Sequence, residues 1–320
     1  MMTTVSVAIP CYRSAKTVPV VADELRAVIT GRPGFDYQII LVNDSPDDKA
    51  TFDAIAALCR EDPKIIGVNL SRNFGQTSAK MAALPYVTGD VLVYMDDDGQ
   101  HPADQIFKLV DKVLEGYDMV YARFPHKKHS LFKRVTSGLN SRLLEFNGAK
   151  PKDVAISSYH AMSRMAVDAL KKYKSPFPSI TGYMFHVVRR YANVDIEHRP
   201  RIEGRSNYTL RRMFRLWLTG FTNFSTVPLR IAAVFGIVCA LIGFITVLVI
   251  VIRKLAGYAF AAGYPTSIAV QLIIGGIIMM ILGLSGEYIG RIYMTVSNMP
   301  QYEIRETLNT PDAKEAEHEE

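Results

Sequence analysis

The chain has 320 residues, a formal net charge of +6 and a hydrophobic fraction of 49%. This length suits one large or two modest domains, and the apolar residues are concentrated toward the C-terminus. Three cysteines, Cys11, Cys59 and Cys239, form no recognisable metal or disulfide spacing, which excludes a disulfide framework and indicates reduced thiols in a cytosolic compartment. We expect no cleavable signal, because residues 5–9 have a strand pattern with no basic leader before them.

Strand and helix patterns alternate over the first 130 residues. The expected strands are Val5–Ile9, Tyr37–Val42, Ile65–Leu70, Val91–Met95 and Met119–Ala122. The expected helices are Thr17–Ile29, Lys49–Arg60, Gln76–Val87 and Pro102–Leu114, and Gly116 is placed to end the last of them. This alternation predicts an α/β fold with a mainly parallel, doubly wound sheet.

Polar turns follow four of these strands, at Pro10–Arg13, Asn43–Ser45, Ser71–Gly75 and Asp96–Gln100. The carboxyl ends of parallel strands form one rim of the sheet, where open α/β folds bind their ligands. The last turn holds three consecutive carboxylates, which repel one another unless a cation lies among them. Mg²⁺ or Mn²⁺ accepts such oxygen ligands together with substrate phosphates, so this turn is a candidate metal site.

One alternative and one further expectation concern the same acidic turn. It can be an ordinary strand-to-helix connection with Pro102 at the first helical position. Side chains at a strand end alternate between faces, so we expect Asp97 to point away from Asp96 and Asp98 and not to be a ligand.

Two apolar runs near the C-terminus predict transmembrane helices, since about 20 residues cross a bilayer core. They are Leu229–Ile252, broken by Arg230 alone, and Thr266–Gly286. A buried hairpin of a soluble core is the alternative, but the first run has no polar stripe at helical spacing. Arginines precede the first run and follow the second, whereas the connecting loop offers only Arg253 and Lys254. We therefore expect both large ends in the cytoplasm.

Two acid-poor basic tracts precede these runs, within 119–144 and 198–215. Arginine suits bidentate phosphate binding, although a basic amphipathic stretch before a span can also lie on anionic headgroups. For Arg211, Arg212 and Arg215 we favour the headgroups. Because the basic residues crowd toward the expected membrane, nucleic acid is a poor partner.

Six segments resemble, in order, the polyprenyl-phosphate glycosyltransferases of glycosyltransferase family 2. They are 7–13 (VAIPCYR), 41–45 (LVNDS), 71–76 (SRNFGQ), 95–102 (MDDDGQHP), 201–208 (RIEGRSNY) and 286–293 (GEYIGRIY). The nearest resemblance is to bacterial members with two C-terminal spans, which transfer glucose or aminoarabinose to undecaprenyl phosphate; dolichyl-phosphate mannose synthase is more distant. The resemblance covers residues 5 to about 302.

The resemblance and the apolar runs together imply four regions. Residues 1–198 would form a cytoplasmic catalytic domain with the GT-A type, Rossmann-like sheet, and 199–228 a basic juxtamembrane segment of amphipathic helices. Residues 229–290 would form a hairpin of two transmembrane helices, and 291–320 a cytoplasmic C-terminal tail whose acidic end, 312–320, we expect to be disordered.

The resemblance also implies roles for single residues. The metal ligands would be Asp98 and Gln100, and the catalytic residues would be Asp96, Asp98 and Asp153, with Asp96 facing the nucleotide sugar. The nucleotide would be held by Pro10, Tyr12, Asp44, Arg72 and Asp96. Phosphate and acceptor contacts would come from Arg123, Lys133, Arg134, Arg201, Arg205 and Ser206. For Asp153, which would orient or deprotonate the acceptor, a helix cap is the alternative.

The chain departs from the family pattern after Asp153, where an acid is usually followed by Gly, Phe and Arg. Ser158, Tyr159 and His160 stand in their place, and Asn207 stands where lysine is common. Loss of the arginine removes a fixed positive charge near the acceptor, which His160 would replace only when protonated.

These features predict an inverting, metal-dependent transferase of the bacterial inner membrane, with Mg²⁺ or Mn²⁺ as its cofactor. It would move one sugar from a nucleoside diphosphate sugar, expected to be a UDP-sugar, to undecaprenyl phosphate at the cytoplasmic face. The resemblance suggests a homo-oligomer, a tetramer. One alternative is a processive polysaccharide synthase, but the absence of a Gln-x-x-Arg-Trp motif argues against it. The other is a non-catalytic nucleotide-binding scaffold, but the presence of Asp96, Asp98 and Gln100 argues against that.

Overall fold

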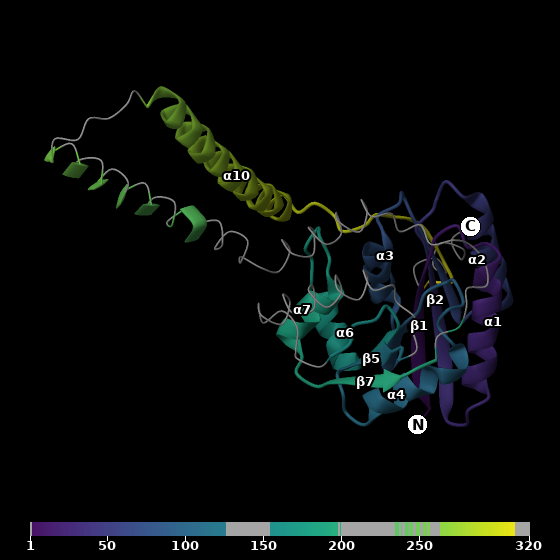
Figure 1. Cartoon of the computed structure of the whole chain (residues 1–320). Coiled ribbons are helices and arrows are strands. Elements are labelled where there is room, and N and C mark those ends of the chain that lie inside the picture. Colours follow the sequence, from purple (N-terminus) through teal and green to yellow (C-terminus); the bar gives the residue numbers. More distant parts are fainter. Residues whose placement is uncertain are drawn as a thin grey trace. The chain divides into compact units, whose positions relative to one another are not determined.

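The computed structural model describes residues 2–125, 154–197, 199 and 263–310, with scattered residues between 234 and 256 (Figure 1). The chain divides into two compact units. One comprises residues 1–208 and 300–320, and the other comprises residues 209–299.

Within the described residues, the first unit is built on an eight-stranded sheet with the strand order β7-β5-β6-β4-β1-β2-β3-β8. The strands are β1 (Thr3–Cys11), β2 (Phe35–Asn43), β3 (Ile65–Leu70), β4 (Val91–Tyr94), β5 (Met119–Arg123), β6 (His160–Ser163), β7 (Tyr191–Asp195) and β8 (Ile304–Leu308). Neighbouring strands pair in parallel from β4 through β1 and β2 to β3, and again between β5 and β7. The prediction of a mainly parallel α/β sheet is confirmed, and its five expected strands are all present.

Helices cover both faces of the sheet. They are α1 (Thr17–Thr30), α2 (Lys49–Glu61), α3 (Gln76–Ala83), α4 (Ile106–Leu114), α6 (Arg164–Lys171) and α7 (Ile180–Val187), with short 3-10 turns η1 (Leu84–Tyr86) and η2 (Ala103–Gln105). The expected helix Gln76–Val87 is divided into α3 and η1, because Pro85 has no N–H to continue the α-helical hydrogen bonds. Gly116 ends α4 as expected, with a φ of +99° and its N–H bonded to the carbonyl of Val113 at 2.8 Å.

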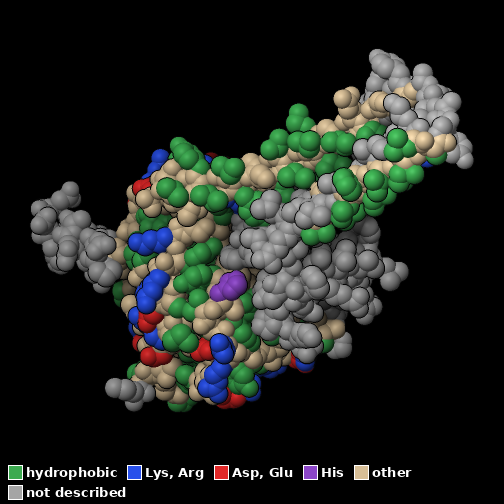
Figure 2. Space-filling view, turned by 90° about the vertical axis from the view of Figure 1, so that its left-hand side faces the viewer, with side chains coloured by type: hydrophobic (Ala, Val, Ile, Leu, Met, Phe, Trp, Pro, Cys, Tyr) green, Lys and Arg blue, Asp and Glu red, His purple; other side chains and the backbone are tan. Residues whose placement is uncertain are grey.

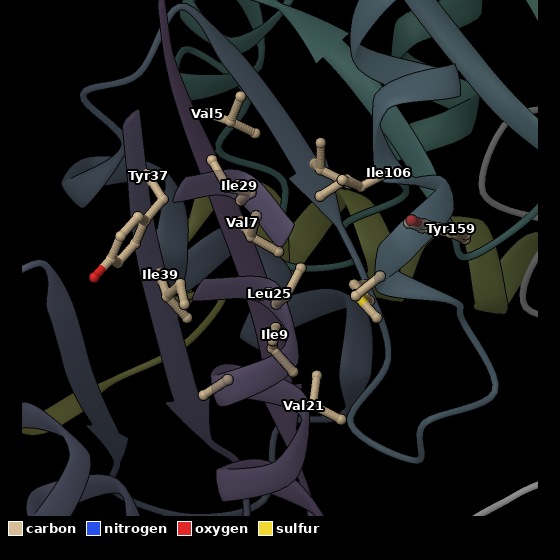
Figure 3. Close-up of a cluster of buried hydrophobic side chains, with 14 of the residues drawn as sticks. Val5, Val7, Ile9, Val21, Leu25, Ile29, Tyr37, Ile39, Ile106 and Tyr159 are labelled. Carbon is tan, nitrogen blue, oxygen red and sulfur yellow. The ribbon is translucent and has the colours of Figure 1, made fainter. Parts of the chain in front are cut away.

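The core has two layers, because successive side chains of a strand point to opposite faces. On one face, Val5, Val7 and Ile9 of β1 pack under Val21 and Leu25 of α1 (Figure 3), and α2 and α4 contribute to the same layer. The other layer lies between the sheet and α3, α6 and α7. Burying each large aliphatic side chain stabilises the fold by roughly 1.5–3 kcal/mol, so this packing on both faces stabilises the sheet that carries the rim.

Three strands were not expected from the sequence. β6 lies between β4 and β5 and runs antiparallel to both. β7 pairs with β5 at one edge of the sheet, and β8 pairs antiparallel with β3 at the other edge. The boundaries inferred from the sequence end the hairpin at 290 and treat 291–320 as a tail, whereas residues 304–308 return to the sheet, where Ile304 and Leu308 pack against its two core layers.

The second unit contains α10 (Tyr264–Val296), a helix of 33 residues that includes the expected span Thr266–Gly286. Among the described residues it is the one helix long and apolar enough to cross a membrane, over Ile274–Val296, and none of that stretch is buried. Figure 2 shows hydrophobic side chains along the surface of this unit. Helical residues also occur between 234 and 255, inside the first expected span, but much of that span and nearly all of 199–228 lie outside the described residues. The pair of spans therefore stays a prediction.

Candidate active site

The four polar turns meet at the carboxyl ends of β1 to β4, as expected. The backbone N–H of Asp44 donates to the carbonyl of Cys11 at 2.9 Å, which joins the turns after β2 and β1. The N–H of Tyr12 donates to a carboxylate oxygen of Asp97 at 3.0 Å, which joins the turns after β1 and β4. The N–H of Phe74 donates to Asp44 Oδ1 at 2.7 Å and brings in the turn after β3.

Asp44 is 3% exposed and both of its carboxylate oxygens accept backbone hydrogen bonds. Oδ1 accepts from Phe74, and Oδ2 accepts from Gly75 at 2.9 Å. Burial raises the pKa of Asp44 to about 6, although these two hydrogen bonds act to lower it. In this structure Asp44 holds the loop that leads into α3, and Gly75, at a φ of +89°, takes a conformation that other residues rarely adopt.

The remaining residues predicted to hold the nucleotide lie around this loop. Tyr12 is 47% exposed on the rim, whereas Pro10 is buried in β1 beside Val42. The exposed guanidinium of Arg72 lies 4.5 Å from the ring centroid of Phe74. The structure thus brings Tyr12, Asp44 and Arg72 to one rim, and their contact with a nucleotide stays a prediction.

Asp96 is held by side chains from two other elements. Gln76 at the start of α3 donates to Oδ1 at 2.7 Å, and the hydroxyl of Ser158 donates to Oδ2 at 2.8 Å. His101 Nδ1 accepts the backbone N–H of Asp96 at 3.0 Å, and its Nε2 lies 3.7 Å from Oδ2. Burial acts to raise the pKa of Asp96, but its electrostatic interactions with His101 and Lys80 and the hydrogen bond from Ser158 outweigh it, so the pKa lies below its usual value.

Lys80, on α3, is a feature of this site that the sequence analysis missed. Its side chain is 6% exposed, and its Nζ donates to the carbonyl of Ser158 at 3.0 Å and lies 5.2 Å from the ring centroid of Tyr94. The signal available in the sequence was a single lysine within the apolar stretch Ala79–Ala83, all of which is buried. Burial lowers the pKa of Lys80, and the charge of Asp96 opposes that shift. Lys80 therefore places an amino group that interacts with Asp96 behind the segment that holds this carboxylate.

His160, the first residue of β6, does not supply the charge of the arginine that it replaces. It is 4% exposed, and burial together with the charge of Lys80 lowers its pKa to about 3, so the ring is neutral at physiological pH. Its ring packs between Tyr94 and Tyr121, with centroid distances of 5.2 and 5.3 Å. The cation near this segment comes instead from Lys80 on α3.

The three consecutive aspartates point to different partners. Asp97 accepts the N–H of Tyr12, whereas Asp96 accepts from Gln76 and Ser158, which agrees with the expectation that Asp97 faces away from Asp96. Burial raises the pKa of Asp97 to about 6. Asp98 Oδ1 accepts the N–H of Gln100 at 3.0 Å across a turn at Gly99, whose φ is +71°.

This turn suits a metal ion that takes part of its coordination from a substrate. In the part of the chain that the structure describes, no group of three or more His, Cys, Asp or Glu side chains could hold a metal ion. Asp98 and Gln100 offer a carboxylate and an amide oxygen, and Mg²⁺ is commonly bound by one or two carboxylates together with substrate phosphates and water. The donor set therefore fits an ion that binds with a diphosphate.

The predicted phosphate contacts are described only at Arg123, at the end of β5. Its Nε and Nη2 donate to the two carboxylate oxygens of Asp195 at 2.5 and 3.0 Å, and both side chains are largely exposed. Phosphate binding by Arg123 would have to compete with this ion pair. The predicted catalytic residue Asp153 lies outside the described residues. So do the other predicted phosphate contacts, which are Lys133, Arg134, Arg201, Arg205 and Ser206.

Comparison with known proteins identifies the class of this site. Residues 6–172 match the family described as "Glycosyl transferase family 2", and residues 227–292 match the "GtrB C-terminal hairpin". With these matches, the α/β domain and its acidic rim define a glycosyltransferase. The chain belongs to glycosyltransferase family 2.

Two curated relatives are similar along nearly their whole length. The chain is 34% identical over 319 residues to an undecaprenyl-phosphate 4-deoxy-4-formamido-L-arabinose transferase of Klebsiella pneumoniae (strain 342), covering 98% of this chain and 96% of that protein. It is 30% identical over 305 residues to the uncharacterized glycosyltransferase YkcC of Bacillus subtilis (strain 168), covering 94% and 93%. A solved structure of glucosyl-3-phosphoglycerate synthase from Mycobacterium tuberculosis, in complex with Mn²⁺, UDP and phosphoglyceric acid, is 20% identical over 68% of this chain and 75% of that one, with a TM-score of 0.49.

Proposed function

We propose that this glycosyltransferase moves one sugar from a UDP-sugar to undecaprenyl phosphate, with inversion at the anomeric carbon, at the cytoplasmic face of a bacterial inner membrane. The observation that carries the proposal is the similarity to an undecaprenyl-phosphate sugar transferase over 98% of this chain, which includes both the α/β domain and the hairpin. A domain that binds a water-soluble donor, joined to a membrane hairpin, suits transfer to a lipid acceptor. The apolar, unburied helix α10 supports this arrangement.

The donor would lie across the rim formed by the four turns. Asp96, whose two oxygens are oriented by Gln76 and Ser158, would face the nucleotide sugar, as the family resemblance implies. Asp98 and Gln100 would hold Mg²⁺ or Mn²⁺ together with the diphosphate. When bound, such an ion stabilises the negative charge that develops on the departing nucleoside diphosphate.

The reaction is a single displacement. An oxygen of the lipid phosphate forms a bond to the anomeric carbon while the bond from that carbon to the diphosphate oxygen breaks, and the nucleoside diphosphate leaves with the electron pair. A phosphate monoester with a second pKa of about 6 is largely a dianion at neutral pH, so it needs little help from a base. Asp153 would then orient the acceptor more than deprotonate it, and Lys133, Arg134, Arg201, Arg205 and Ser206 would contact its phosphate.

A transfer assay tests the reaction class. Membranes containing the full chain would be supplied with undecaprenyl phosphate, Mg²⁺ and a panel of labelled nucleotide sugars. We expect a chloroform-soluble sugar monophosphate lipid with a UDP-sugar and no product after chelation of the metal. A long water-soluble polymer would indicate a processive synthase, and nucleotide binding without transfer to any acceptor would indicate a scaffold.

The topology has its own test. We propose two spans within 229–290, a membrane-associated segment over 199–228 and both termini in the cytoplasm, in a homo-oligomer that resembles the family's tetramers. Protease tags at Met1 and Glu320 should both be protected in intact cells and both be cleaved after permeabilisation. Cleavage of one tag alone in intact cells would contradict the pair of spans.

A further inference from the structure

The segment that follows the helical unit in the chain contacts the rim of the site at two points. The N–H of Ser71, at the start of the loop after β3, donates to the carbonyl of Glu303 at 2.9 Å. The side chain of Glu306 on β8 accepts a hydrogen bond from Asn69 Nδ2 at 2.7 Å. Both contacts lie at the carboxyl end of β3, where the polar turn Ser71–Gly75 begins.

The hydrogen bond to Glu306 continues through side chains into the rim. Asn69 Oδ1 accepts from Asn43 Nδ2 at 2.9 Å. Asn43 Oδ1 accepts from both the backbone N–H and the hydroxyl of Ser45, at 3.2 and 3.0 Å. Ser45 Oγ then accepts the backbone N–H of Arg13 at 3.0 Å. This series of side-chain hydrogen bonds thus runs from β8 across β3 and β2 to the turn after β1.

Groups at both ends give these hydrogen bonds a single direction, because the Glu306 carboxylate only accepts and the backbone N–H groups of Ser45 and Arg13 only donate. A carboxylate only accepts, so Asn69 turns its amide NH₂ group toward Glu306 and its oxygen toward Asn43. Asn43 points its NH₂ group toward Asn69 and its oxygen toward Ser45. The hydroxyl of Ser45 donates to Asn43 Oδ1 and accepts the backbone N–H of Arg13. Asn43 and Ser45 have no exposed surface and Asn69 is 4% exposed, so bulk water has little access to these three residues.

The series of hydrogen bonds ends at Arg13, whose backbone conformation needs support from its neighbours. Arg13 has a φ of +53°, which is uncommon for a residue with a side chain and persists where the surroundings hold it. Its N–H is held by Ser45, and the N–H of Tyr12 before it is held by Asp97. Ser45 therefore sets the shape of the turn that presents Tyr12 on the rim.

We propose that Glu306, acting through Asn69, Asn43 and Ser45, is a positioning residue for the donor-binding turn Pro10–Arg13. Glu303 and Glu306 then support the donor site, although they follow α10 in the sequence. The proposal rests on the proposed function, which assigns this turn to the nucleotide. It differs from a purely structural role of β8, because backbone pairing with β3 requires no particular side chain at position 306.

The coupling is tested first without any ligand. Hydrogen–deuterium exchange of the full chain in nanodiscs would compare the wild type with Glu306→Ala, Glu306→Gln and the matched control Arg305→Ala, which changes an exposed neighbour on the same strand. We expect Glu306→Ala to speed exchange in the peptide spanning residues 11–14 about fivefold. Glu306→Gln should resemble the wild type, because its amide oxygen still accepts from Asn69, and Arg305→Ala should have no effect.

Ser45 is the last side chain in this series of hydrogen bonds. Ser45→Ala should therefore speed exchange in the same peptide while leaving β8 protected. Equal exchange at residues 11–14 in Glu306→Ala and the wild type would overturn the proposal. So would a uniform rise over the whole sheet, since that pattern indicates loss of the edge strand and not loss of a directed contact.

Calorimetry of UDP binding in the presence of Mg²⁺ tests whether the order of this turn affects binding of the donor. We expect the Kd for UDP to rise about fivefold in Glu306→Ala and to be unchanged in Glu306→Gln and Arg305→Ala. Faster exchange with an unchanged Kd would also overturn the positioning role. If the wild type itself does not bind UDP, the donor assignment fails, and the exchange experiment still decides whether Glu306 orders the turn.

Discussion

The buried lysine behind Asp96 gives the sharpest test of how the site is organised. Lys80→Met keeps the length and most of the volume of the side chain but removes its charge and its donor. The structure assigns two interactions to that ammonium group. It donates to the carbonyl of Ser158, whose hydroxyl donates to Asp96, and its charge contributes to the lowered pKa of Asp96.

The magnitude follows from the hydrogen bond alone. A hydrogen bond that involves a charged group contributes about 1.5–3 kcal/mol, and 1.4 kcal/mol corresponds to about a tenfold change in rate. If Ser158 and Asp96 are positioned for the donor by Lys80, kcat/KM for the donor should fall about 10- to 100-fold. The melting temperature should also fall, because the carbonyl of Ser158 loses its donor and Asp96 loses a nearby positive charge, and buried polar groups left without partners cost about 1–3 kcal/mol.

The assay is steady-state transfer of label to the lipid acceptor, with the melting temperature measured in parallel. Lys80→Gln is the matched control, since it retains a donor for the carbonyl of Ser158 without the charge. Activity of Lys80→Met within about twofold of the wild type would refute the positioning of Asp96 by this lysine.

Three further changes have defined outcomes. Asp98→Asn should abolish transfer without lowering the melting temperature, because it removes the only negatively charged ligand of the predicted pair Asp98 and Gln100; near-normal turnover at saturating Mg²⁺ would contradict the metal assignment. Gly89→Ala should destabilise the fold by about 1–3 kcal/mol, since the added Cβ would lie 2.6 Å from Ser6 Oγ and 2.7 Å from the carbonyl of Thr4; an unchanged melting temperature would contradict this steric argument. His160→Phe should remove part of the acid sensitivity of the fold. With a folded pKa near about 3, below that of the unfolded chain, His160 costs no stability above about pH 6.5 and a growing amount as the pH falls, on the order of 2 kcal/mol at pH 5. Unfolding would be followed by labelling of the buried thiols Cys11 and Cys59 at pH 7 and at pH 5. The melting temperature should fall less between pH 7 and pH 5 in His160→Phe than in the wild type, and equal falls would contradict the assignment.

The sequence predicted those parts of the fold whose signals are local. The alternation of apolar runs and helical spacing identified β1 to β5 and the helices between them, and a continuous apolar run such as Val91–Met95 is typical of a strand buried on both faces. β6 and β8 are short, of four and five residues, and are positioned by pairing with strands distant in sequence. Their formation depends on the strands with which they pair, which no local pattern reveals.

The same distinction applies to the site. The motifs identified the four turns of the rim, because each directly follows a strand. They did not identify Lys80, which lies one helical turn after Gln76 on α3, or Glu306, which is separated from Asn69 by 237 positions in the chain. These residues act through buried hydrogen bonds, and their partners are known only once the strands are placed side by side.

The two missed residues also explain how three adjacent carboxylates come to differ. Asp96 is oriented by side chains from α3 and the segment before β6, and Asp97 by the backbone of the turn after β1, whereas Asp98 bonds to the backbone of its own turn. Lys80 strengthens the first arrangement and Glu306 supports the turn used by the second. Identical side chains thus acquire different orientations from neighbours outside the acidic motif. A change to either neighbour should therefore alter donor binding while leaving Asp98 and Gln100 in place, so the metal dependence of transfer in Lys80→Met and Glu306→Ala should match that of the wild type even where the donor affinity does not.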